Sequence, residues 1–425
     1  MHVIEDVACT ICGCVCDDLR ITVDENRITQ ATGACYLAEP WFLEQNSREP
    51  PAAEVHGRPA NLESGLDEAA AILKNARGPL IYGLSRSSTD GQRAAVRLAD
   101  RIGANIDTTA SRCHAPSIMA IQEVGESTCT LGEIKNRADL VIFWGVNPLR
   151  SHPRHFERYS VDPPGLFVPL GRKGRTVVVL DVRPNETTET ADLFIPVEAG
   201  KDFEAIWALR CLVRGLTPAA DVPTGVSLEV LAKLAARMKS CTCGVIFFGL
   251  GLAGTGLGHA NVEALLRLVT DLNEHTRFYA RRMRIPGDVT GADSVLCWQT
   301  GFPFSVNLSR GYPRYNPGEY SGNELLERGE VDAGLFVGSE GVLAMSSRAR
   351  DYLARIPTIV LDHPTVESTF PPQIRFTTAV YGIHLPGTAY RMDEVPIPLR
   401  QLLPQQYLSD AQILDAIRER IESGR

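Results

Sequence analysis

Five cysteines near the start of the chain are the residues with the clearest chemical potential. Cys9, Cys12, Cys14 and Cys16 fall within eight residues, and Cys35 follows after a longer gap. The spacing C-x2-C-x3-C allows three thiolates to turn inward from one tight loop, and a distant fourth can complete the shell. Iron–sulfur clusters are held by four thiolates in this way. We therefore predict that Cys9, Cys12, Cys16 and Cys35 are ligands of such a cluster, with Cys14 as a spare thiol.

Two other structures fit the same cysteines. Four thiolates also suit a structural zinc ion. A disulfide knot is disfavoured, because no signal peptide precedes the motif and the chain is long. The remaining scattered cysteines are predicted to be small buried hydrophobic side chains; they are Cys129, Cys211, Cys241, Cys243 and Cys297.

A second stretch with chemical potential is Cys113-His114, within residues 111–117. A thiol beside an imidazole can be a nucleophile with its base, or a soft metal ligand with a neighbouring proton carrier. Such a pair is more often structural. Adjacent residues on a strand point to opposite faces, which disfavours direct activation of Cys113 by His114.

Polar side chains also follow two apolar stretches that we predict to be strands. Asn147, His152 and Arg154 come after residues 138–145. Their amide, imidazole and guanidinium groups suit the capture of a phosphate or another polar ligand, although a solvated basic loop is the simpler alternative. Asp181 and Arg183 come at and after the end of the next such stretch. An acid at a strand end can bind a ribose or a base edge.

A glycine-rich loop at residues 249–256 follows another apolar stretch and precedes a predicted helix. The backbone amides around Gly249 and Gly251 could approach a phosphate at the start of that helix. Glycine-rich turns are common, so this signal is weak by itself. The spacing departs from the dinucleotide fingerprint, and we do not predict an NAD site.

These loops need a rigid sheet to hold them. Short stretches that are apolar throughout alternate with amphipathic helical patterns, and such strands are covered on both faces, as in doubly wound parallel sheets. Ligands of these sheets bind beyond the carboxyl ends of the strands. The predicted strands are 79–83, 105–107, 138–145, 176–181 and 244–249, and the helices are 66–75, 90–102 and 261–273. A hairpin at 19–29 and a linker near 47–59 precede them.

Composition limits the class of protein. The chain has 425 residues, of which 44% are hydrophobic and 22% charged, with a net charge of −8. These values are typical of a globular protein with several domains. No apolar run approaches the roughly 20 residues of a membrane helix, and the negative charge does not indicate a nucleic-acid surface. Cysteines without a secretion signal indicate a reducing compartment, so we expect a cytoplasmic location without membrane or nucleic-acid partners.

At this level of detail the sequence resembles a known family. The N-terminal cysteines, the turn at 181–183 and residues 190–193 are similar to the molybdopterin oxidoreductases. More narrowly, the chain resembles the B subunit of formylmethanofuran dehydrogenase, through motifs spread over nearly its whole length. The motifs are residues 111–117, Trp144-Gly145-Val146-Asn147-Pro148, His152-Pro153-Arg154-His155, residues 284–291, Gly311-Tyr312-Pro313-Arg314-Tyr315-Asn316-Pro317-Gly318-Glu319, and residues 387–393.

The resemblance implies a fold and a set of cofactors. The fold is α/β and molybdopterin-oxidoreductase-like, with doubly wound parallel-sheet domains and a small β-rich iron–sulfur module, and without the C-terminal β-barrel domain that this family places on a separate subunit. The N-terminal cysteines would hold one [4Fe-4S] cluster. Tungsten or molybdenum would be carried by two molybdopterin guanine dinucleotides and bound by Cys113, with His114 and Arg284 as the charged residues beside it. A soft thiolate suits such a metal, and an arginine can hold formate through paired hydrogen bonds.

The resemblance also implies a reaction, partners and a division of the chain. The expected reaction interconverts CO2 and formate in one-carbon metabolism, with the A, C and D subunits of the complex as partners. An amidohydrolase-like subunit among them would condense formate with methanofuran. The expected segments are 1–50 for the iron–sulfur module, 51–130 with 330–400 for one α/β domain, 131–280 for a Rossmann-like domain, 281–329 returning to the active site, and 401–425 for a C-terminal helix.

A rival function comes from the same resemblance. Homologous subunits occur in a bacterial formyltransferase/hydrolase complex that releases formate from a formylated methanofuran-like carrier, where the homologue of this chain acts as a scaffold without metal chemistry. After Cys35 the chain reads Tyr36-Leu37-Ala38-Glu39, whereas redox relatives tend to have a basic residue there. Because Cys113, His114, Arg284 and the cluster cysteines are all present, we favour the redox function.

Overall fold

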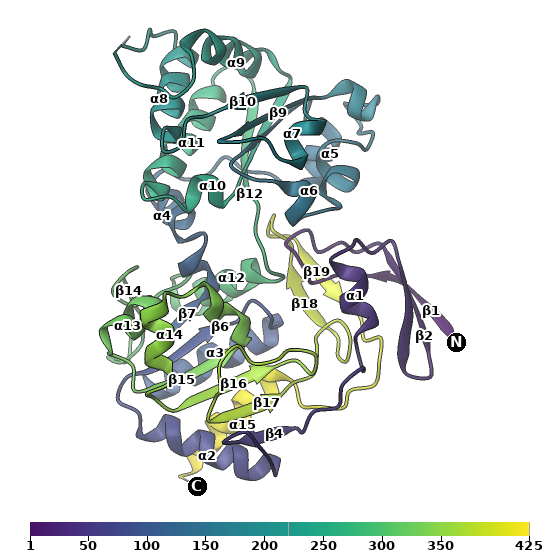
Figure 1. The fold of residues 1–425 in the computed structure, drawn as a ribbon, viewed down its shortest axis with the longest axis vertical. Helices are drawn as coiled ribbons and strands as arrows, with labels where there is room; N and C mark the ends of the chain where they lie inside the picture. Colours follow the sequence, from purple (N-terminus) through teal and green to yellow (C-terminus); the bar gives the residue numbers. More distant parts are fainter. Residues whose placement is uncertain (220, 425) are drawn as a thin grey trace. The chain divides into compact units, whose positions relative to one another are not determined.

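A computed structural model of the chain describes residues 1–219 and 221–424. The chain forms two compact units (Figure 1). Unit 1 comprises Met1–Arg112 and Ile285–Arg425, and unit 2 comprises Cys113–Arg284. Both are mixed α/β structures built on sheets with parallel strands, which confirms the predicted fold class. The finer five-segment division of the chain stays a prediction.

Unit 2 contains a five-stranded parallel sheet in the order β10-β9-β8-β11-β12. Its central strands are fully buried because their apolar side chains point alternately into two packed layers. One layer is the core formed with α4, α8, α9 and α11. The strands are β8 (Leu140–Trp144), β9 (Thr176–Asp181), β10 (Leu193–Pro196), β11 (Cys243–Phe248) and β12 (Arg277–Arg282); the longer helices are α4 (Ala115–Val124), α5 (Leu131–Arg137), α8 (Asp202–Val213), α9 (Leu228–Ser240) and α11 (Gly258–Leu272).

Short helical turns follow three of these strands at their carboxyl ends. They are α6 (Pro148–Ser151) with the π-helical turn Phe156–Ser160 after β8, α7 (Glu186–Thr190) after β9, and α10 (Leu250–Ala253) after β11. Because all five strands are parallel, these turns belong to one edge of the sheet. This edge carries the polar and glycine-rich loops that the sequence singled out.

Unit 1 contains a nine-stranded sheet in the order β14-β13-β7-β6-β15-β16-β17-β4-β5. Strands β7 to β17 in this order are parallel, and antiparallel strands extend both sides. The strands are β4 (Ala53–Val55), β5 (Arg58–Ala60), β6 (Pro79–Gly83), β7 (Asn105–Thr108), β13 (Val306–Asn307), β14 (Arg314–Tyr315), β15 (Ala333–Val337), β16 (Thr358–Asp362) and β17 (Ile374–Thr377).

Helices cover both faces of this sheet, as a doubly wound fold requires. One core joins the strands to four helices, and a second core joins them to two helices from the other side. The first set is α2 (Leu62–Asn75), α3 (Thr89–Ile102), α12 (Val289–Thr300) and α15 (Asp410–Ser423); the second is α13 (Gly322–Arg328) and α14 (Ser347–Leu353). Figure 1 shows α2, α15 and α3 against the sheet of unit 1.

The N-terminal module is a three-stranded antiparallel sheet of β1 (His2–Val7), β2 (Leu19–Asp24) and β3 (Arg27–Thr32). The hairpin predicted from alternating residues is therefore confirmed. The cysteine loop connects β1 to β2, and α1 (Ala38–Leu43) follows Cys35. A separate hairpin, β18 (Gly387–Tyr390) with β19 (Pro396–Leu399), packs its Ala389 against Ala8 and Val15 of the cysteine loop in one small core.

One of the scattered cysteines differs from the prediction. The prediction that Cys297 is buried is wrong, because its thiol lies on the exposed side of α12 beside Trp298. The core-facing side of that helix is taken by Ala292, Val295 and Leu296.

Among residues 1–219 and 221–424, none of the helices combines the length and the hydropathy that crossing a lipid bilayer requires.

One buried carboxyl in unit 1 gives the fold a testable pH dependence. Asp288 accepts hydrogen bonds from the backbone amides of Gly291 and Tyr390 and from the Gln92 side chain. Burial outweighs these donors and raises the pKa of Asp288 to about 8. Between about pH 4 and pH 8 the folded state keeps a proton on Asp288 that the unfolded state has lost. The free energy of unfolding therefore declines as the pH rises through this range, by up to about 1.4 kcal/mol per pH unit.

The nearly isosteric Asp288→Asn variant should remove this slope, because an amide oxygen can keep accepting from Gly291 and Tyr390. We expect the Tm of the wild type to fall more between pH 6 and pH 8 than the Tm of the variant, measured by calorimetry. Asp415→Asn, at a more exposed carboxyl on α15, is the control. Equal Tm shifts in wild type and Asp288→Asn would contradict the assignment.

Candidate functional site

The cysteine loop of unit 1 is a tight, buried turn. The amide of Cys9 donates to the carbonyl of Cys16 over 2.8 Å, and the amide of Val15 donates to Cys12 over 3.1 Å. Val15 has a φ of 37°, which a β-branched residue rarely adopts. This unusual backbone lets the chain reverse within a few residues, so that the thiols of the loop come from one short segment.

The thiols of this loop and Cys35 lie within electrostatic range of one another. The pKa of Cys9 is raised well above its usual value, first by burial and then by the neighbouring Cys12, Cys16 and Cys35. The spare Cys14 also belongs to this group, since its side chain hydrogen-bonds with Cys12 and Cys16. The structure thus brings together all four predicted ligands, and no disulfide joins any of the eleven cysteines, all of which lie in the described part of the chain.

The chemistry of this donor set fits an iron–sulfur cluster. Buried thiols with raised pKa values stay protonated unless a cation compensates the thiolates, and the irons of a cluster supply that charge. Burial raises the pKa of the Cys35 thiol, and the backbone amides of Leu37 and Ala38 offset part of this effect. Within the part of the chain that the structure describes, no group of three or more His, Cys, Asp or Glu side chains is arranged to hold a metal ion.

Two later segments of unit 1 form hydrogen bonds with the cysteine loop. The amide of Gly287 donates to the carbonyl of Ile11 over 3.2 Å, and the amide of Met392 donates to Gly13 over 2.8 Å. A Cβ on Gly287 would lie 2.4 Å from the carbonyl oxygen of Thr10, so only glycine permits this approach. The segments around 287 and 392, both within motifs of the resemblance, therefore support the cysteine loop.

A small pocket lies at the carboxyl ends of β15 and β16, where ligands of doubly wound sheets bind. Arg86 donates to Glu340 over 3.0 Å, and Asp362 accepts from the amide and hydroxyl of Ser339, both over 2.8 Å. Burial and the charge of Arg86 lower the pKa of His363 to about 3, so this imidazole is neutral. The sequence does not indicate these residues, because nothing in it shows that the segments near 86, 340 and 362 meet.

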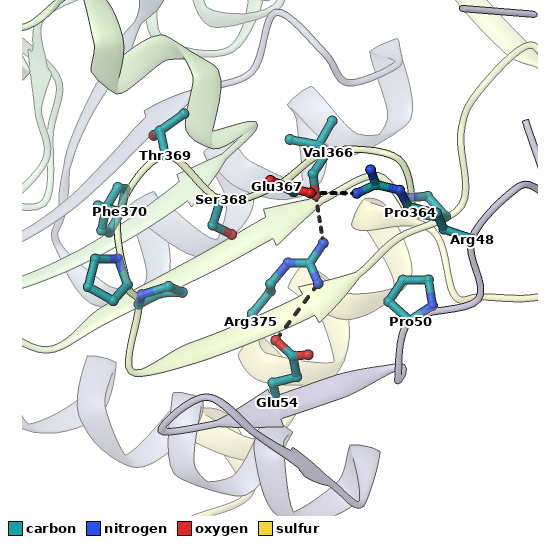
Figure 2. A pocket seen from close by; sticks show the side chains of 12 residues that line it. Arg48, Pro50, Glu54, Pro364, Val366, Glu367, Ser368, Thr369, Phe370 and Arg375 are labelled. Carbon is teal, nitrogen blue, oxygen red and sulfur yellow. Dashed lines mark hydrogen bonds and ion pairs between the residues drawn. The ribbon is translucent and has the colours of Figure 1, made fainter. Parts of the chain in front are cut away.

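A wider, open pocket of about 560 Å³ lies on unit 1 next to β17 (Figure 2). Its charged side chains pair with one another: Arg48 with Glu367 at 2.8 Å, and Arg375 with Glu54 at 3.8 Å. Arg375 also donates to the carbonyl of Val366. The opposite charges balance, so this pocket has no excess charge to select an ionic ligand.

In unit 2, the predicted polar loops meet at the carboxyl edge of the sheet. Asn147 lies after β8 and contacts the loop after β9, donating to Glu186 and accepting from the Thr187 hydroxyl. The amide of Gly251, after β11, donates to the carbonyl of Gly145 over 3.0 Å. A Cβ on Gly251 would lie 2.6 Å from that carbonyl oxygen, so this glycine allows the two loops to pack closely. Gly249 is buried at the start of α10.

The other predicted binding residues of unit 2 differ in their exposure and in their contacts. Asp181 ends β9 and accepts from the amide of Val182 and from Asn185, which leaves it partly exposed. Arg183 is exposed in the same turn. Arg154 forms an ion pair with Glu157 and lies on the segment that leads into the π-helical turn.

Two histidines from separate segments of unit 2 converge on the residues after β12. His114 contacts the carbonyl of Met283 through Nε2 at 3.1 Å, and His152 contacts the carbonyl of Arg284 through Nε2 at 2.9 Å. Burial lowers the pKa of His152 to about 4; burial and the charges of Arg284 and Arg282 hold the pKa of His114 well below its usual value. Both imidazoles are therefore neutral at pH 7, so His114 is not a charged group here.

Cys113 lies in the turn between the 3-10 turn Thr109–Arg112 and α4, not on a strand. Its side chain is partly exposed, whereas His114, which follows it, is buried. Because His114 is bound to Met283, the structure places the turn that carries Cys113 beside the segment that ends in Arg284. The structure thus brings together the segments that carry the three residues that the resemblance assigned to catalysis.

Comparison with known sequences gives two informative relatives. The chain is 39% identical to the B subunit of the tungsten-containing formylmethanofuran dehydrogenase 2 of Methanocaldococcus jannaschii, over 99% of each chain. It is 26% identical to the B subunit of the formyltransferase/hydrolase complex Fhc of Methylorubrum extorquens, over 68% of this chain and 75% of that protein. No family model matches the sequence.

Two solved structures share the fold. The formyltransferase/hydrolase complex FhcABCD from Methylorubrum extorquens, in complex with methylofuran, has a chain that aligns with a TM-score of 0.73 at 23% identity, over 88% of this chain and 99% of that chain. Acetylene hydratase from Pelobacter acetylenicus aligns with a TM-score of 0.72 at 11% identity, over 99% of this chain and 69% of that chain.

Proposed function

Because this chain belongs to the family of formylmethanofuran dehydrogenase B subunits, as its full-length similarity shows, we propose that it is the redox subunit of such a complex. In this proposal it interconverts CO2 and formate at a tungsten or molybdenum centre. Cys113 is the protein ligand of the metal, and two molybdopterin guanine dinucleotides carry it. Cys9, Cys12, Cys16 and Cys35 hold a [4Fe-4S] cluster.

The observation that carries this proposal is the convergence of the Cys113-His114 turn with the segment ending in Arg284. These residues are 170 positions apart in the sequence, yet His114 lies 3.1 Å from the carbonyl of Met283, which directly precedes Arg284. The charge of Arg284 is close enough to lower the pKa of His114, and Cys113 directly precedes His114 in the sequence. Their joint placement supports a site for a small anion beside a soft metal ligand.

The roles of the chain's own residues follow from charge and contacts. Arg284 is almost fully buried, and its positive charge favours an anionic substrate such as formate. The neighbouring Arg282 forms an ion pair with the largely buried side chain of Glu126 at 3.7 Å. His114 contacts Ser117 and Met283 through its two ring nitrogens, so its role in this structure is to hold backbone. When bound, the metal with its pterins would exchange the electron pair that separates formate from CO2.

The loops at the carboxyl edge of each sheet are the proposed seats of the two dinucleotides. In unit 2, Asn147, Asp181, Gly249 and Gly251 lie at that edge, with Arg154 and Arg183 on its loops. In unit 1, the pocket around Arg86 and Asp362 holds the same position relative to its sheet. We propose that phosphate and guanosine groups are bound there, because polar ligands of doubly wound sheets bind at this edge.

The second candidate is the scaffold function of the formyltransferase/hydrolase complex, favoured by the similarity to the B subunit of Fhc. One experiment separates the two. The native complex is purified anaerobically, its tungsten and molybdenum are measured, and it is assayed for dye reduction with formate and for formyl hydrolysis. Metal with dye reduction supports the redox proposal. Formyl hydrolysis without metal and without dye reduction would establish the scaffold.

The proposal also predicts stable partners. In the family, a small β-barrel subunit and an amidohydrolase-like subunit complete the enzyme, and we expect both to co-purify with this chain at near-equal amounts. The measurement is affinity purification of the tagged chain from its native host, followed by mass spectrometry. A monodisperse, cofactor-loaded monomer that needs no other subunit would contradict this expectation.

A further inference from the structure

We propose that His152 is a positioning residue for Arg284, and that His114 and His152 together clamp the backbone that carries this arginine. The inference concerns contacts within unit 2, and its importance for catalysis rests on the proposed function. It gives His152, for which the sequence suggested cofactor binding, a different task.

The contacts of His152 define its hydrogen positions. Its Nε2 lies 2.9 Å from the carbonyl oxygen of Arg284, and its Nδ1 lies 2.8 Å from the hydroxyl of Ser151. A carbonyl oxygen only accepts, so Nε2 must carry the hydrogen. In a neutral imidazole Nδ1 is then an acceptor, and the single hydrogen of the Ser151 hydroxyl is shared between Nδ1 and the carbonyl of Asn147, 3.0 Å away. Ser151 thereby supports the tautomer that the carbonyl of Arg284 requires.

His114 repeats this arrangement one residue earlier. Its Nε2 lies 3.1 Å from the carbonyl of Met283, and its Nδ1 lies 3.2 Å from the hydroxyl of Ser117. Two serine–imidazole pairs from different segments thus donate to two consecutive carbonyls. Both imidazoles are 2% exposed, so water cannot readily replace either donor.

The two histidine contacts lie at the point where the hydrogen bonds of the sheet end. Pairing of β11 with β12 ends at Phe248 and Arg282, and one further bond joins the amide of Met283 to the carbonyl of Phe248. The two carbonyls that the histidines bind lie at and beyond this last sheet bond. The histidines therefore fix the backbone of Met283 and Arg284, which sets the direction of the Arg284 side chain. A guanidinium can orient a substrate effectively only when its own position is held closely.

His155 provides a matched control from the same loop. It is fully buried, and its Nδ1 contacts the Ser160 hydroxyl at 2.9 Å. Its ring packs edge-to-face on Phe247, with centroids 4.7 Å apart, and its Nε2 does not bond to the backbone near Arg284. Replacing His155 with Phe therefore perturbs the loop without removing a donor from residues 283 and 284.

The experiment compares His152→Phe, His152→Gln, Ser151→Ala and His155→Phe in the purified complex. The first readout is hydrogen–deuterium exchange of the peptide covering residues 279–288, and the second is the split between kcat and KM for formate. We expect His152→Phe to speed exchange at least about tenfold and to raise KM as well as lower kcat. Gln, whose amide can donate from nearly the same place, should restore most of the wild-type behaviour, and Ser151→Ala should fall between.

His155→Phe should leave both readouts near the wild type, even where it lowers Tm. The proposal is overturned if His152→Phe leaves exchange unchanged, or if His155→Phe changes it equally. If His152→Phe does not fold, the comparison of Ser151→Ala with His155→Phe decides the matter. Exchange is measured independently of turnover, so a wild-type complex without formate oxidation but with the expected exchange pattern would refute the redox function and keep the clamp.

Discussion

Replacing Cys113 with serine is expected to abolish formate oxidation while the protein still folds and assembles. Serine offers a harder oxygen donor in place of a soft thiolate, and tungsten or molybdenum should bind it differently or not at all. Cys113 is partly exposed in a turn, so the substitution disturbs little packing. The measurement is formate-dependent dye reduction by the rebuilt complex, alongside formyl hydrolysis.

Cys129→Ser is the matched control, because Cys129 is also a partly exposed thiol of unit 2 but has no proposed role. It should leave dye reduction intact. If the chain is instead a scaffold, Cys113→Ser would cost at most about 1–3 kcal/mol of stability for placing a hydroxyl in a partly buried position, and formyl hydrolysis would continue. Undiminished dye reduction by Cys113→Ser would refute the role of Cys113 as the metal ligand.

The second large effect is expected at the N-terminal cysteines. Anaerobically purified protein should contain about four irons and four sulfides per chain, and Cys16→Ser should lose most of them. The reason is that burial and the neighbouring Cys12, Cys16 and Cys35 raise the pKa of the Cys9 thiol, and a buried thiolate needs a cation to compensate it. Iron and sulfide assays, with electron paramagnetic resonance of the reduced protein, provide the measurement.

The matched control is Cys14→Ser. Cys14 is equally buried and hydrogen-bonds with Cys12 and Cys16, yet it is the spare in the predicted ligand set. We expect Cys14→Ser to keep close to four irons per chain. Stoichiometric zinc without iron in the wild type would show a structural zinc site instead, and loss of iron in Cys14→Ser but not in Cys16→Ser would show that the ligand set is chosen wrongly.

The sequence alone predicted the architecture at the level of strands and helices. The strand predicted at 79–83 matches β6, and residues 176–181 match β9. These predictions succeeded because a strand buried on both faces must be apolar throughout, a local property that does not depend on which strands are its neighbours. The family could be recognised for a similar reason, since each of its motifs is a short segment that is identified without knowledge of the fold.

The tertiary structure decided what each site residue contacts. No local pattern places His152 on the carbonyl of Arg284, 132 residues later, or joins Asn147 to Glu186. The exposure of Cys297 was likewise set by which side of α12 meets the core.

These contacts arise because parallel strands bring loops that are distant in the sequence to one edge, and the order of the strands follows from packing of the whole sheet. The sequence therefore determined which chemically reactive side chains the chain carries. The order β10-β9-β8-β11-β12 and the loops that it brings together decided which of them contact one another.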